Sequence, residues 1–236
     1  MRQLYIFFIT IPKIAKSLSG GSMLMCASLS IQMWVFVIFK KIGFFKSGMI
    51  IKGRYNAQTV EYNLTQVMDL AALKEVYVLN EYVWDIGIKI ETVIDLGAHF
   101  GDTAIFYNAV YPKAKIIAVE PFQKNFERLE KNTNKLKNVK ALQAAVGPFD
   151  GNIDLYESTS SLGHSIFSRE LESAKSRVSQ ISLRTLLDDN KIEKADIIKL
   201  DIEGAEFSLL ESINPSDISN AYIGELHFDL APTFDM

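Results

Sequence analysis

A ten-residue stretch, Thr92–Gly101 (TVIDLGAHFG), carries the first residues whose types and spacing could do chemistry. A short apolar run ends in Asp95, and Gly97 and Gly101 follow four residues apart. An apolar strand that ends in an acid and a glycine-spaced turn is how α/β domains begin a nucleotide pocket. The dinucleotide fingerprint GxGxxG is absent, which disfavours a nicotinamide or flavin cofactor. Asp95 would repel a pyrophosphate, but it suits a ligand that carries an amine or a sulfonium.

A second acid, Glu120, ends the next apolar segment, nineteen residues after Gly101. An acid at this position can accept hydrogen bonds from the two hydroxyls of a ribose. The third apolar segment ends near Ala144 and Ala145, whose small side chains leave room for an adenine ring. Ala145 fits a core position equally well, so both interpretations stay open for it.

The densest group of acids lies in Lys199–Glu206 (KLDIEGAE), where Asp201, Glu203 and Glu206 fall within six residues. They follow a buried strand, and ligands bind at the carboxyl ends of parallel strands. Crowded carboxylates repel one another, so a purely structural role is not expected. We expect at least one of them to bind substrate, hold a cation or cap the helix that follows.

Two further groups are candidates for contact with a substrate. Glu225 and His227 lie two residues apart on a strand segment, so their side chains share one face. A histidine near a strand tip can take a proton from an alcohol, or it can be a hydrogen-bonded residue at a sheet edge. His164 lies in the serine-rich segment 157–168 and could also touch substrate, whereas His99 is expected to shape the glycine turn.

Composition narrows the class of protein. The formal net charge of −3 and a pI near 5.7 give no footprint for nucleic acid. The single cysteine, Cys26, excludes an internal disulfide and fits a reducing, cytoplasmic compartment. There is no close-spaced metal-binding motif, so no metal is expected.

From Glu91 onward, apolar strand segments alternate with helical segments. The expected strands are 92–96, 115–120, 139–146, 195–201 and 221–228, and the expected helices between them are 102–111, 122–135 and 205–213. This alternation predicts an α/β, Rossmann-like fold with a mostly parallel twisted sheet, right-handed crossovers and helices on both faces.

The chain is expected to have three parts. Residues 1–48 form an apolar helical segment flanked by lysines, and 17–39 contain no charged residue. Three interpretations of it stay open: a helical cap or oligomer contact, a helix on the membrane surface, or a membrane span. Residues 49–91 form a mixed lead-in, with a loop or short strand at 52–61. Residues 92–236 form the nucleotide-binding domain.

The ordered motifs DLGAHFG, AVEP, AAVG, DGNIDLY, SLRTLLD, IIKLDIEGAE and IGELHF resemble the FkbM family of S-adenosylmethionine-dependent methyltransferases. The resemblance covers residues 92–228, and KLDIEGAE is its most specific motif. It implies a class I methyltransferase fold, S-adenosyl-L-methionine as the cofactor, and methyl transfer to a hydroxyl. In such folds a helix and an antiparallel hairpin follow the fifth strand. Only residues 229–236 remain, so this hairpin is expected to be missing.

The resemblance also implies roles for individual residues. The residues expected to contact the cofactor are Asp95, Gly97, Ala98, Gly101, Glu120, Pro121, Ala144, Ala145 and Asp201. The candidates for the general base are His227, Asp201 and Glu203. The candidates for contact with the acceptor are Glu206, Glu225 and His164.

The expected substrate is a hydroxyl on a sugar, a glycolipid or a secondary metabolite. Homo-oligomers and membrane-surface association through residues 1–48 are open alternatives to an isolated cytoplasmic chain. A different class of function also stays open, in which the chain keeps the fold but has lost catalysis and acts as a membrane-associated or scaffold module.

Overall fold

The computed structural model describes the chain except for residues 1, 45–47, 84–86, 158–173, 203 and 227–236. The chain divides into two compact units. One unit comprises Met1–Val83 and Ile105–Pro112, and the other comprises Trp84–Ala104 and Lys113–Met236.

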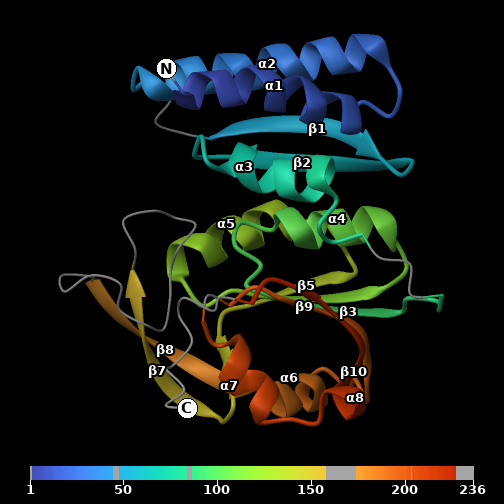
Figure 1. Ribbon diagram of the computed structural model, residues 1–236, viewed down its shortest axis with the longest axis vertical. Helices are drawn as coiled ribbons and strands as arrows, with labels where there is room; N and C mark the ends of the chain where they lie inside the picture. Colours follow the sequence, from blue (N-terminus) through green and yellow to red (C-terminus); the bar gives the residue numbers. More distant parts are fainter. Residues whose placement is uncertain (1, 45–47, 84–86, 158–173, 203, 227–236) are drawn as a thin grey trace. The chain divides into compact units, whose positions relative to one another are not determined.

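The part of the first unit up to Leu79 contains two long helices, a β-hairpin and a short helical segment (Figure 1). These are α1 (Arg2–Ser17), α2 (Met23–Lys41), β1 (Met49–Tyr55), β2 (Gln58–Leu64), α3 (Asp69–Lys74) and the π-helix η1 (Glu75–Leu79). Helix α2 begins at a conventional N-cap, where the side chain of Ser22 accepts a hydrogen bond from the N–H of Met25 at 3.3 Å. The helix contacts α1 and β1. Among the described residues, α2 is the helix that is long and apolar enough to cross a membrane, by length and composition only.

Residues 52–61, for which a loop or short strand was predicted, lie in a β-hairpin of two strands. Strands β1 and β2 pair antiparallel, with Lys52 opposite Glu61. Asn56 and Ala57 join them with φ of 47° and 63°, which is the geometry of a tight two-residue hairpin. The segment is polar because part of the hairpin is open to solvent: Ile51 and Val60 are buried, whereas Ile50, Lys52 and Thr59 are exposed.

The second unit is built on five parallel strands, as predicted. They are β3 (Thr92–Leu96), β4 (Lys115–Val119), β5 (Val139–Leu142), β9 (Ala195–Leu200) and β10 (Ser219–Gly224). Their order across the sheet is β10-β9-β3-β4-β5, and every neighbouring pair is parallel. This order is that of a Rossmann-like α/β fold.

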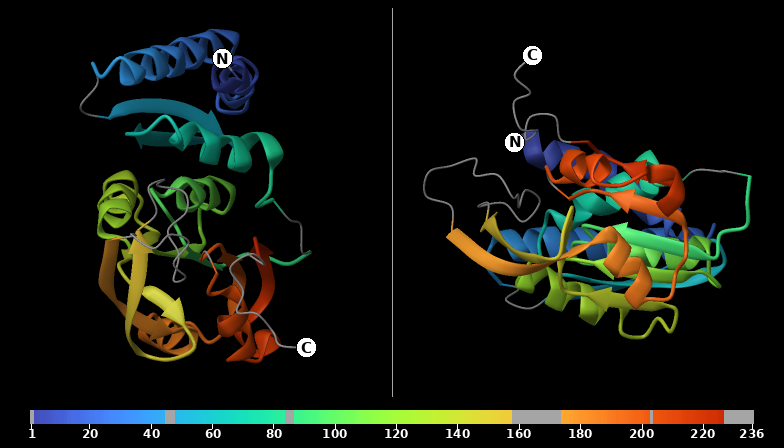
Figure 2. Two further views of the ribbon diagram at one scale, coloured as in Figure 1. Left: turned by 60° about the vertical axis from the view of Figure 1, so that its left-hand side comes forward. Right: turned by 90° about the horizontal axis from the view of Figure 1, so that it is seen from below.

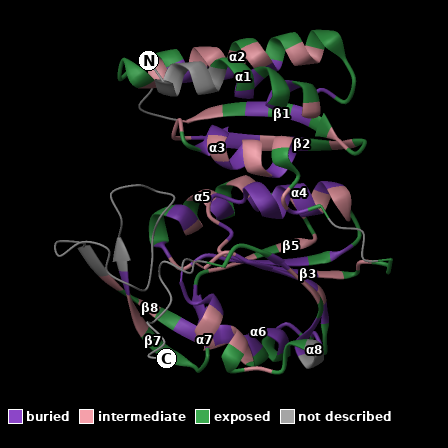
Figure 3. Ribbon diagram, viewed as in Figure 1, coloured by how far each residue is buried: buried purple, intermediate pink, exposed green. Residues whose placement is uncertain are grey.

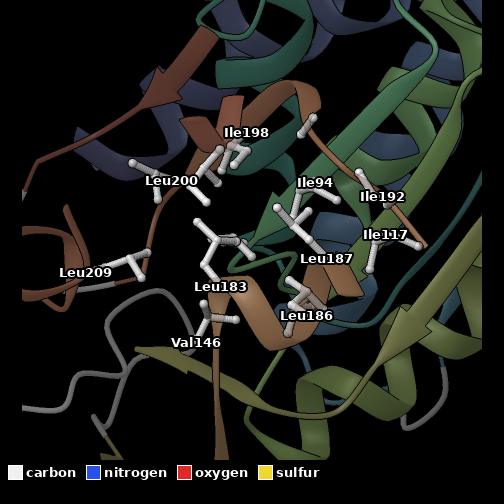
Figure 4. Packing of buried hydrophobic residues seen from close by; sticks show 14 of the residues in the cluster. Ile94, Ile117, Val146, Leu183, Leu186, Leu187, Ile192, Ile198, Leu200 and Leu209 are labelled. Carbon is white, nitrogen blue, oxygen red and sulfur yellow. The ribbon is translucent and has the colours of Figure 1, made fainter. Parts of the chain in front are cut away.

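Helices cover both faces of this sheet (Figures 1 and 2). Helix α5 (Gln123–Thr133) lies on one face, where its Leu129 packs on Ala118. The opposite face carries α6 (Leu183–Asp189), α7 (Glu206–Glu211) and α8 (Pro215–Ile218). Figure 4 shows the main core on that side, in which strand and helix side chains interdigitate; these include Ile94, Ile117, Ile198, Leu183, Leu186 and Leu187.

The expected third strand, 139–146, is in fact two strands in different sheets. β5 ends at Leu142, and β6 (Ala145–Gly147) pairs with β8 (Ala174–Ser182), which also pairs with β7 (Gly151–Glu157). Gln143, which is exposed, and Ala144, which is buried, separate the two strands. The local sequence does not reveal which sheet each half joins, because the partner of β6 is the distant strand β8.

Candidate functional site

The glycine turn and the acidic motif meet at one point of the sheet. From β3 the chain moves to β4 and β5 on one side and then returns to β9 and β10 on the other side. Ligands of open α/β sheets bind outside the carboxyl ends of the strands at such a switch point. There the N–H of Asp201, after β9, donates to the carbonyl of Leu96, at the end of β3, at 3.2 Å.

Gly97 is required by the close approach of these two segments. Its φ is +77°, and a Cβ at this position would overlap the carbonyl oxygen of Asp201. Gly97 was expected to contact the cofactor, but the space that a Cβ would take there is filled by the backbone after β9. Gly101, with φ of +92°, serves α5: a Cβ there would lie 3.1 Å from Leu129 and 3.3 Å from Thr133.

The backbone N–H groups of the glycine turn are directed at the protein itself. Those of Gly97 and Ala98 both donate to the carbonyl of Val119 at 3.0 Å, and that of Gly101 donates to the carbonyl of Ala98 at 2.7 Å. His99, held at a φ of 47°, donates its N–H to Glu120. A pyrophosphate site needs such groups to point outward. The turn is therefore not built to hold phosphates, in agreement with the missing GxGxxG.

Glu120 follows β4 and its carboxylate is fixed by the backbone. Oε2 accepts from the N–H of His99 at 2.9 Å, and Oε1 accepts from the N–H of Phe122 at 3.0 Å. The residue is 4% exposed, and burial raises the pKa of its carboxyl to about 7 although both N–H groups favour the charged form. The side chain of Asn125 also hydrogen-bonds to this carboxylate. A carboxylate has about four lone-pair sites, so capacity remains to accept from a hydroxyl group.

Lys199 is a central residue of the site to which the sequence motifs assigned no role. Its side chain is 2% exposed, and its Nζ donates to the carbonyl of Gly97 at 2.6 Å. The same Nζ lies 3.3 Å from Oδ1 of Asp95 and 3.5 Å from Oδ2 of Asp201. A lysine near the end of a largely apolar parallel strand was the available signal, because a buried lysine needs an acidic partner.

Asp95 is fully buried, beside Lys199 on the neighbouring strand. Its Oδ2 accepts from Oγ1 of Thr103 at 2.6 Å, which ties β3 to the first turn of α4 (Asp102–Val110). Burial raises the pKa of the Asp102 carboxyl to about 7; Lys199 opposes this rise, and Asp95 and Asp201 add to it.

The site therefore gathers four acids, Asp95, Asp102, Glu120 and Asp201, around the buried cation Lys199. Because the acids outnumber the lysine, the charge of the site favours a positively charged ligand over an anionic one. This group of acidic side chains fits S-adenosylmethionine, whose sulfonium and ammonium groups are cationic.

The acids of KLDIEGAE have different surroundings. The side chain of Asp201 is 28% exposed. Glu206 is fully buried, and its two oxygens accept from the N–H groups of Ile202 at 3.0 Å and Gly204 at 2.9 Å. Glu206 thus closes the loop that carries Asp201. Glu203 lies outside the described residues.

The remaining predicted site residues fall into two groups. Ala144 and Ala145 are buried, and Ala144 belongs to the hydrophobic core; Pro121 is half-buried beside Glu120. Glu225 is exposed, and its N–H donates to the carbonyl of Leu200 at 3.0 Å, next to Asp201. His164 and His227 lie outside the described residues.

Comparisons with known proteins point to one family. Residues 95–235 match the methyltransferase FkbM domain. The methyltransferase sdnD of Sordaria araneosa is 26% identical over 155 residues, which are 52% of this chain and 60% of that protein. The chain thus spans about three fifths of the length of this curated relative.

Two solved structures are similar to this chain at low sequence identity and low TM-score. The precorrin-6y C5,15-methyltransferase of Geobacter metallireducens is 15% identical, with a TM-score of 0.33, over 60% of this chain and 53% of that one. The fibrillarin of Aeropyrum pernix, solved with natively bound S-adenosyl-L-methionine, is 16% identical, with a TM-score of 0.32, over 66% of this chain and 50% of that one. The domain match covers more than half of the sequence. The chain therefore belongs to the FkbM family of S-adenosylmethionine-dependent methyltransferases.

Proposed function

We propose that this chain binds S-adenosylmethionine at the carboxyl ends of β3, β4 and β9 and transfers its methyl group to a hydroxyl of a small-molecule or glycan acceptor. The observation that carries this proposal is Glu120, a buried carboxylate held by the N–H groups of His99 and Phe122 beside the switch point of the sheet. The acidic balance around Lys199 supports a cationic ligand at the same edge.

Each described residue has a defined part in this proposal. Glu120 accepts hydrogen bonds from the two ribose hydroxyls, and Pro121 and Ala145 border the base. Gly97, Ala98 and Gly101 give the turn its shape. Asp95 is a positioning residue, because it holds Lys199, and Lys199 in turn holds the carbonyl of Gly97.

When bound, S-adenosylmethionine would supply a methyl group on a positively charged sulfur. An acceptor oxygen that lies in line with the carbon–sulfur bond can take this methyl group, and the sulfur leaves as a neutral thioether. The chain has to align that oxygen and remove its proton. We assign the role of general base, which takes the hydroxyl proton, to Asp201. It is the partly exposed acid in the described part of KLDIEGAE. Glu203 and His227 stay candidates for the same role. Glu225 and His164 are proposed to contact the acceptor, while Glu206 holds the loop in place.

Calorimetric titration with S-adenosylmethionine tests the cofactor part. We expect wild-type protein to bind, and Glu120→Gln to bind roughly 10- to 100-fold more weakly, because two hydrogen bonds to a charged acceptor are lost. Glu127→Gln is the matched control, since Glu127 is an exposed acid on α5. A folded wild-type protein that does not bind would refute the proposal. Unchanged binding by Glu120→Gln would refute only the ribose contact.

Methyl transfer itself is tested with labelled cofactor and a panel of sugars, glycolipids and hydroxylated metabolites. We expect Asp201→Asn to lower the turnover by at least about 100-fold, which is a larger factor than that by which it weakens cofactor binding. Asp154→Asn, on β7, is the control. Binding of cofactor without transfer to any acceptor would favour the scaffold alternative.

A further inference from the structure

Helix α2 has one face that packs within its own unit. Leu29, Met33, Phe36 and Val37 are buried, at the spacing of a single helix face. The helix contacts α1 and β1. This packing accounts for only part of the helix, because 22% of its most apolar stretch is buried.

The opposite face of α2 is also apolar. Leu24, Ile31, Ile38 and Ile42 follow at intervals of seven, seven and four residues and are 86%, 63%, 51% and 68% exposed. Figure 3 shows exposed positions along much of α2. Other large apolar side chains exposed in the same unit include Phe8, Ile9, Met23 and Phe44. A helix that is apolar all round is normally buried, so an apolar phase is expected to cover this face.

The charge of the surrounding sequence is strongly one-sided. The first 60 residues contain eight lysines and arginines and no aspartate or glutamate. The other 176 residues contain 17 basic and 28 acidic residues. Lys13 and Lys16 are exposed on α1, and Lys41 is exposed at the end of α2. Such an asymmetry is typical of a segment that meets an anionic surface.

We propose that the outward face of α2, defined by Leu24, Ile31, Ile38 and Ile42, docks on the surface of an anionic lipid bilayer. The helix lies in the plane of the interface and does not span the bilayer, because spanning would strip the buried face from α1 and β1. The lysines on α1 and at the end of α2 attract the lipid headgroups. A second copy of the chain is a poorer partner, because two cationic segments would repel each other.

Flotation of the full-length protein with vesicles tests the proposal. We expect binding to vesicles of phosphatidylcholine mixed with phosphatidylglycerol, and much weaker binding to phosphatidylcholine alone. The double variant Ile31→Asn and Ile38→Asn should weaken binding at least tenfold, because two apolar side chains no longer enter the lipid. Lys13→Gln with Lys16→Gln should weaken binding to the anionic vesicles by a smaller factor, and added salt should do the same.

Phe149→Asn is the matched control, because Phe149 is 62% exposed but belongs to the other unit. It should float as the wild type does. Failure of the wild type to float, or equal flotation of the isoleucine double variant, would overturn the proposal. Analytical sedimentation without lipid tests whether a second copy of the chain covers this face instead. If the wild type is a dimer, the isoleucine double variant is a monomer and vesicle binding is unchanged, the face belongs to a dimer interface and the proposal is overturned.

Discussion

The carboxyl edge of the five-stranded sheet and the outward face of α2 depart from the usual distribution of residues in opposite directions. At the sheet edge the chain buries charges, namely Lys199, Asp95 and Glu120. On α2 it leaves large apolar side chains such as Leu24 and Ile31 open to solvent. The buried charges are compensated within the chain, by ion pairs and backbone N–H groups. Compensation for the exposed apolar face has to come from outside it.

The largest effect is expected at the turn after β3. Gly97→Ala should lower the free energy of unfolding by more than about 4 kcal/mol, because the new Cβ overlaps the Asp201 carbonyl in addition to the strain at positive φ. Gly43→Ala, at a similar φ of +73° with no atom within 4 Å of the new Cβ, should cost about 1 kcal/mol. Urea denaturation measures both. Equal costs would show that the contact with Asp201 does not constrain the turn.

Removal of the buried cation should have the next largest effect. Lys199→Met should cost about 3 kcal/mol, because Asp95 is left buried without its partner. The double variant with Asp95→Asn should recover part of this loss in a double-mutant cycle. Lys52→Met breaks a surface pair, in which Lys52 is 64% exposed and 2.8 Å from Glu61, and should cost less than about 1 kcal/mol. A loss at Lys199 no larger than that at Lys52 would contradict the compensation inferred for the sheet edge.

The raised pKa values predict opposite pH trends for stability and for cofactor binding. The pKa values of Glu120 and Asp102 are raised to about 7 in the folded protein, so the stability that these two groups contribute is present at low pH and is lost as the pH rises through about 7. Over the same interval Glu120 becomes a carboxylate, so S-adenosylmethionine should bind more tightly. Calorimetry on both sides of pH 7 tests this, and Glu120→Gln should flatten the affinity profile. An affinity that falls with rising pH in the wild type would exclude the carboxylate contact.

The smallest effect is expected on the outward face of α2. Ile31→Asn should change the free energy of unfolding by less than about 0.5 kcal/mol, because Ile31 is 63% exposed. Leu29→Ala, on the buried face of the same helix, should cost about 3 kcal/mol. Thermal and urea denaturation without lipid provide the measurement. A large cost at Ile31 would mean that the outward face is already covered within the protein.

Much of the sheet could be predicted because its signals are local. Each buried strand is a short apolar run, and the helices between β3, β4 and β5 have helical spacing, so the five parallel strands were predicted in the correct chain order. The hairpin β1–β2 was missed, because a polar strand with one covered face has a weak apolar pattern. The break between β5 and β6 was missed for a related reason, since pairing with β8 depends on residues more than thirty positions away.

The candidate site was predictable in part. Gly97, Gly101, Glu120 and Asp201 could be selected because an acid or a glycine at a strand end is a local pattern. Local patterns could not predict that the side chain of Glu206 points inward or that Asp95 is buried. Those properties depend on which neighbouring groups hydrogen-bond to each carboxylate in the folded chain, and the spacing of residues in the sequence does not indicate these partners.

The sequence by itself determined the α/β class, the succession of the five strands along the chain and the family, because these depend on periodicity and on short motifs. The tertiary structure alone decided why position 97 must be glycine, since the Asp201 carbonyl occupies the space of a Cβ there. It also decided that Lys199 joins the site, through a bond to Gly97 across 102 positions of the chain. Finally, it decided which face of α2 stays open. Such contacts join segments far apart in sequence, so they exist only after the chain has folded.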